Sequence, residues 1–167
     1  EQGFNVAVGH EAGAVMTTGT GNTLVGGLAG DSLTTGSSNT VLGYDALSTE
    51  DEYGTNTAVG YQSLKALNAG DNAYNVAVGF QTGLNISTGI QNTIIGSLAG
   101  DALTTGNYNI AIGHTALSTE DTGHKSVAIG HQALLNQNYD GDASNVAVGH
   151  NVGAAITTGT VNTLIGA

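Results

Sequence analysis

Short apolar segments recur along the chain at nearly constant spacing. Each is a five-residue unit: Asn, a β-branched residue, an apolar residue, then Val, Ile or Leu, and finally Gly. The units are 17 residues apart, or 19 after the fourth and eighth. β-Branched residues followed by Gly are typical of a short strand that ends in a tight turn, and a repeat of this length predicts one turn of a parallel β-solenoid. The units begin at Asn5, Asn22, Asn39, Asn56, Asn75, Asn92, Asn109, Ser126, Asn145 and Asn162.

The rest of each repeat is also regular. An Ala-Gly or Ala-Leu pair predicts a second short strand, and a polar run such as Thr17-Thr18-Gly19 predicts the turn that follows it. A longer period of 70 residues, four coils, is superimposed on the first, because the segment that starts at Leu28 returns almost unchanged at Leu98. We therefore expect one all-β domain over residues 1–167, a parallel β-solenoid or β-roll of about ten coils of 17–19 residues.

Both faces of the expected strand are apolar. Alternate side chains of a strand point to opposite sides, so the second and fourth residues of the unit share one face. We expect the fourth residue, always Val, Leu or Ile, to line the coil interior. The third residue would then point outward, where a second copy of the chain would cover it. This predicts an oligomer interface formed by Ala7, Leu24, Val41, Ala58, Ala77, Ile94, Ala111, Ala128, Ala147 and Leu164.

Composition and charge exclude several classes of protein. The chain has no Cys, so disulfide-stapled modules and Cys-ligated zinc domains are excluded. Its net charge is −11, with Lys65 and Lys125 as the only basic residues apart from His, which argues against nucleic acid and anionic membranes as partners. No apolar run reaches the ~18 residues that span a bilayer. No constellation of catalytic residues stands out from the repeats, so we predict that the chain is not an enzyme and needs no cofactor.

The residue after the repeated Gly is often a planar ring. It is His at positions 10, 114, 131 and 150, but Tyr44, Tyr61 and Phe80 occupy the same place in other coils. The imidazoles are weak candidates for metal ligands, while the mixture of ring types favours a stacking ladder. The acidic turns Glu50-Asp51-Glu52, Glu120-Asp121 and Asp140-Gly141-Asp142 favour a solubilising role. Calcium is the alternative ligand. The metal candidates are thus His114, His131, His150, Asp140 and Asp142.

Two further patterns have simple interpretations. The Asn that opens nearly every unit predicts an internal amide ladder or a left-handed turn. Thr pairs in several polar turns raise ice binding as a function, but the rows are broken by Asp51-Glu52 and Asn138-Tyr139.

The sequence resembles the NTAVGYQAL-type repeats of tailed-bacteriophage fibres and the related coils in the heads of trimeric autotransporter adhesins. Residues 56–64 read NTAVGYQSL, and residues 126–134 read SVAIGHQAL. The resemblance covers nearly the whole chain. It implies a left-handed β-roll assembled as a parallel homotrimer.

The resemblance also implies a function. It favours a structural shaft or head segment of an extracellular attachment fibre, located on the virion as part of a phage tail. A bacterial surface adhesin or a self-assembling filament subunit is the alternative, and an ice- or calcium-binding solenoid is a lesser one. The expected partner is the chain itself, with host-cell glycans or proteins bound through other domains.

Overall fold

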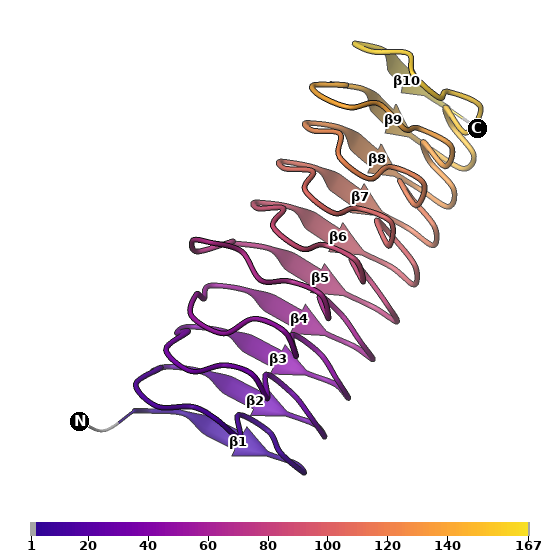
Figure 1. Cartoon of the computed structure of the whole chain (residues 1–167). Helices are drawn as coiled ribbons and strands as arrows, with labels where there is room; N and C mark the ends of the chain where they lie inside the picture. The colour runs from indigo at the N-terminus through magenta and orange to yellow at the C-terminus, as the bar shows by residue number, and fades with distance from the viewer. Residues whose placement is uncertain (1–2, 167) are drawn as a thin grey trace.

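The computed structural model describes residues 3–166 and is all-β. Its ten strands are each three residues long and pair in parallel with their sequence neighbours, so that the chain forms one rod-shaped solenoid with its two ends at opposite ends of the rod (Figure 1). The register is constant, because each strand residue pairs with its equivalent in the next unit. The strands are β1 (Val6–Val8), β2 (Thr23–Val25), β3 (Thr40–Leu42), β4 (Thr57–Val59), β5 (Val76–Val78), β6 (Thr93–Ile95), β7 (Ile110–Ile112), β8 (Val127–Ile129), β9 (Val146–Val148) and β10 (Thr163–Ile165).

The Gly that ends each unit forms the corner at which the chain leaves the sheet. These glycines have φ between 127° and 149°, a region that side chains rarely adopt. A Cβ atom on Gly60 would also collide with the backbone oxygen of Gly79 in the next coil. The corner therefore needs Gly for two reasons, its backbone conformation and the close approach of stacked coils.

The return half of each coil is a series of turns, so the prediction of a second strand is wrong. In the third coil, Asp45 and Leu47 both have positive φ, near 58° and 47°. This left-handed conformation prevents an extended backbone. Coils are still joined along this wall, since Leu47 N–H donates to Ser63 O at 3.0 Å and Gln62 N–H donates to Tyr44 O at 2.9 Å.

The third residue of the unit faces the coil interior, and the fourth residue faces outward. Both directions are the opposite of those predicted, so the predicted oligomer interface is wrong. Eight of its ten members, Leu24, Val41, Ala58, Ala77, Ile94, Ala111, Ala128 and Ala147, are completely buried within a single chain. Ala7 and Leu164, the other two, belong to the first and last strands, where one neighbouring coil is absent. The eight buried residues pack inside the coil and cannot contact a sister chain. The thin interior explains the frequent Ala, since a small side chain leaves room for the opposite wall.

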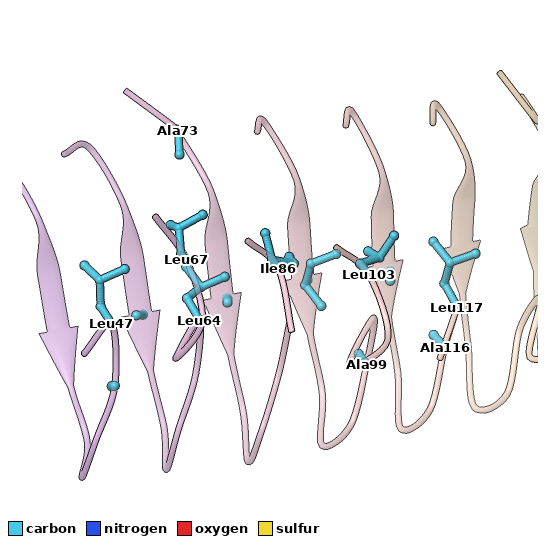
Figure 2. Close-up of a cluster of buried hydrophobic side chains, with 14 of the residues drawn as sticks. Leu47, Leu64, Leu67, Ala73, Ile86, Ala99, Leu103, Ala116 and Leu117 are labelled. Carbon is cyan, nitrogen blue, oxygen red and sulfur yellow. The ribbon is translucent and has the colours of Figure 1, made fainter. Parts of the chain in front are cut away.

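The opposite wall supplies the other large side chains of the core. Its ninth coil position is Leu in four coils, and two of these leucines, Leu47 and Leu117, lie beside the strands in Figure 2. In other coils this position is Gly, and a Cβ on Gly30 or Gly100 would meet a methyl group of Leu33 or Leu103. The core is therefore packed coil by coil.

Among the described residues, no helix is long and apolar enough to cross a membrane.

An amide ladder runs along the interior edge of the sheet, as predicted. Asn39 N–H donates to Asn22 Oδ1 at 2.9 Å, and Asn22 Nδ2 donates to Gly36 O at 2.8 Å. The N–H to Oδ1 bond repeats in every unit from Asn22 to Ser126, and the ladder side chains are buried except at the first coil. The Nδ2 bond differs at Asn39 and Asn56, whose amides donate to Asn22 Oδ1 and Gly54 O instead. Each Asn thus satisfies backbone groups that the short strands leave without partners.

The corner glycines generate a stability prediction. Replacing Gly60 with Ala should lower the free energy of unfolding by roughly 2–4 kcal/mol, because the new Cβ is strained and meets backbone that cannot move aside. Chemical denaturation followed by circular dichroism measures this. Gly70→Ala is the matched control, because a Cβ there has nothing within 4 Å. Equal losses in the two variants would contradict this account of the corner.

Candidate functional site

The outer face of the sheet is a long surface without charged side chains. It is formed by the second and fourth residues of each unit, none of which is charged. In the inner strands β4 to β9 these residues are partly exposed on both sides of a buried central residue. Leu42 in β3 is 49% exposed. The fourth-position row, predicted to be interior, therefore lies outside, and a sheet face of this kind is usually covered by another layer.

A column of stacked rings borders this face, as predicted. Tyr44, Tyr61 and Phe80 lie one above another with centroids 5.8 and 5.3 Å apart. In the second block the equivalent residues, His114, His131 and His150, stack at 5.4 and 4.9 Å. All six rings are exposed at their edges, and every interplanar angle is 13° or less. The rings therefore form two separate ridges two residues beyond the strands, interrupted where Ser97 occupies the position between Phe80 and His114.

The predicted metal ligands lie in two different places. His114, His131 and His150 stack face to face, so their nitrogens do not converge on one point. Asp140 accepts a hydrogen bond from Thr122 Oγ1 at 2.7 Å, and Asp142 pairs with Lys125 at 2.7 Å. Among residues 3–166, no three His, Asp or Glu side chains are close enough to hold a metal ion.

A shallow groove of about 640 Å³ on another side of the rod contains carboxylates. Glu11, Asp31 and Asp51 are among its lining residues. Burial raises the pKa of Asp31, and burial does the same for Asp101, its equivalent in the second block. One buried oxygen of each lacks a hydrogen-bond partner among the described residues. The groove is acidic and open, and it contributes negative charge to this side.

The Thr residues of the polar turns have a structural role in part. Thr17, Thr34 and Thr104 donate their hydroxyls to carbonyl oxygens of the following coil at 3.0–3.1 Å. These hydroxyls bind the backbone, so they do not form a free polar row.

Two glutamates of the predicted surface turns are completely buried. Glu50 accepts hydrogen bonds from the backbone N–H groups of Tyr53 and Ala69, both at 3.2 Å. Glu120 accepts them from Gly123 at 2.8 Å and from Tyr139 at 3.3 Å. Ala69 and Tyr139 occupy equivalent places in the two 19-residue coils. Each Glu thus fixes the longer coil that follows it, so a solubilising role is wrong for these two residues.

The second glutamate belongs to a buried polar network. Gln137 Nε2 donates to Glu120 Oε2 and to Ser126 Oγ, both at 2.9 Å, and its carbonyl accepts from Asn145 Nδ2 at 2.8 Å. The equivalents of Gln137 and Ser126 in the first block are Leu67 and Asn56. Where the ladder Asn is replaced by Ser, a Gln in the adjacent wall supplies the missing amide.

An alignment of all coils would have found these buried residues from the sequence. Glu50, Glu120 and Gln137 stand at the twelfth coil position, which is otherwise Met, Leu or Ile. A polar residue in an apolar row indicates a buried group with a specific partner.

Comparison with known proteins adds no assignment. No family model matches the chain, and no curated protein or solved structure matches it either.

The Gln137 network can be tested by a compensating pair of substitutions. Gln137→Leu should destabilise the chain by about 1–3 kcal/mol, because it removes the hydrogen-bond partner of the buried Ser126 hydroxyl and one hydrogen bond each from Glu120 and Asn145. The double variant S126N/Q137L recreates the arrangement of the first block and should recover most of that loss. Thermal or urea denaturation measures both. A double variant no more stable than the single one would refute the compensation.

Glu50 generates a pH prediction. Burial raises its pKa above the ordinary value of 4.5, because desolvation disfavours the carboxylate more than its N–H donors favour it. The folded chain therefore holds this proton more tightly than the unfolded chain does. The contribution of Glu50 to stability is largest below the unfolded pKa and falls as pH rises through the folded value.

We therefore expect the stability difference between wild type and Glu50→Gln to shift in favour of wild type as pH falls from 7 towards 4. Urea denaturation at a series of pH values measures this difference. A shift in the opposite direction would mean that the N–H donors outweigh desolvation.

Proposed function

We propose that the chain is a stiff shaft segment of an extracellular attachment fibre, built from several parallel copies, as in a phage tail fibre. The observation that carries this proposal is the unbroken axial stacking of ten coils in one register. Hydrogen bonds run along the rod on the sheet and on the turn wall, and the Asn side chains add a third line inside. A rod joined along several lines resists bending better than a flexible linker and keeps its ends at a fixed separation.

The surface also fits a protein that works outside the cell. Its two lysines are both paired with carboxylates, Lys65 with Asp45 at 2.6 Å and Lys125 with Asp142 at 2.7 Å. The chain has no arginine, so these are the sites available to trypsin-like proteases. Short hydrogen-bonded turns, rather than long loops, connect the strands, and such turns are poor protease substrates. The same features suit a bacterial surface adhesin or filament, which is the alternative.

The apolar outer face supports assembly from several copies. A charge-free sheet face of ten strands is large for a chain that stays monomeric. The number three follows from the resemblance to phage fibres and adhesin heads. In this arrangement the shaft positions other domains that bind the host surface, and its own role is mechanical.

Two solution measurements test this function together. Sedimentation equilibrium should give three times the mass of the 16.5 kDa chain. A variant with a second copy of residues 75–144 inserted after residue 144 adds four coils, and small-angle scattering should show a rod about 19 Å longer with an unchanged cross-section. A stable monomer at micromolar concentration, or a rod that does not lengthen, would overturn the proposal.

A further inference from the structure

The outer sheet face differs between the two halves of the rod. In the first block the second position of the unit carries a hydroxyl in three consecutive strands, Thr23, Thr40 and Thr57. In the second half of the rod, the consecutive strands β7, β8 and β9 carry only aliphatic side chains on this face. We call this region the aliphatic patch, and it consists of Ile110, Ile112, Val127, Ile129, Val146 and Val148.

We propose that the aliphatic patch is the principal docking site for a second copy of this chain. This inference rests on the proposed assembly from several copies, and it adds which part of the rod holds them together. Burying Ile and Val releases water from apolar surface without cost to a polar group. Burying a Thr hydroxyl requires a new hydrogen-bond partner or loses affinity. Contact through β7 to β9 is therefore stronger than contact through β2 to β4.

Charge favours a second copy on this face over the other faces of the rod. The net charge of −11 comes from residues elsewhere on the coil, including Glu11, Asp31 and Asp51 around the acidic groove. Two copies that approached through that side would bring like charges together, which opposes contact. The sheet face is free of charged residues, so it is the surface on which two identical acidic rods meet at least electrostatic cost.

Periodicity also favours a second copy over an unrelated partner. The side chains of the patch form ridges separated by the ~4.8 Å strand spacing. An identical coil has ridges of the same period, so the two surfaces can interlock over many strands rather than at one point. A partner without this repeat would match the patch only locally.

The outer sheet face is small for a stable protein–protein interface, so the packing of its side chains matters. Ten strands at ~4.8 Å spacing, each about 10 Å long, present roughly 450 Å² of outer face, so a pair would bury about 900 Å² in total. This is the size of a weak interface. Stable association therefore depends on the best-packed region, and the patch is where the aliphatic side chains are most concentrated.

The 70-residue repeat supplies a matched pair of variants. Ile110 and Val127 correspond to Thr40 and Thr57 of the first block. Exchanging residues between equivalent positions gives I110T/V127T and T40I/T57V. All four side chains point away from the coil core, so both variants should fold, and circular dichroism with thermal melting checks this. Sedimentation equilibrium over a range of concentrations then gives the association constants of the two variants and of wild type.

We expect I110T/V127T to weaken association at least about tenfold and T40I/T57V to strengthen it. An oligomeric wild type whose association I110T/V127T leaves unchanged would overturn this inference while leaving the proposed function in place. A wild type that stays monomeric would overturn the proposed assembly itself. If I110T/V127T fails to fold, T40I/T57V alone tests the inference. An association constant of T40I/T57V no higher than that of wild type would then refute the docking role of the aliphatic patch.

Discussion

The axial hydrogen bond between one coil and the next is the interaction on which the structure depends. Strands of three residues are too short to be stable in isolation, and each gains its partners only from the coils above and below. The Gly corners allow the close approach that these bonds need, because a Cβ there would collide with the neighbouring backbone. The Asn ladder extends the same bonding into the coil interior, where no water could replace it.

The buried polar residues follow from this dependence. A 19-residue coil has two more residues to accommodate than its neighbours, and a buried Glu in the preceding coil binds N–H groups in that longer segment. Gln137 then takes over the amide that Ser126 lacks. The interior thus tolerates a change of residue when another residue in an adjacent wall supplies the same donors and acceptors.

The strand positions, their parallel order and the amide ladder could be predicted from the sequence, because each depends on the spacing of repeated residues. The ring stack could be predicted for the same reason. The inward and outward rows could not, since Ala58 and Val59 are both apolar and alternation alone does not say which faces the core. The predicted second strand does not form because residues such as Asp45 and Leu47 adopt positive φ, and a Leu side chain gives no sequence signal for that conformation. The handedness and the number of chains stay predictions.

The constant register has a consequence for how the rod forms. Each strand contacts only the strands before and after it in the sequence, so no strand pairing has to wait for distant parts of the chain to meet. Once a pair of coils has formed, folding can propagate by the addition of one neighbouring coil at a time, in either direction. Loop-closure entropy is then the same small amount at every step, and a long array costs no more per coil than a short one.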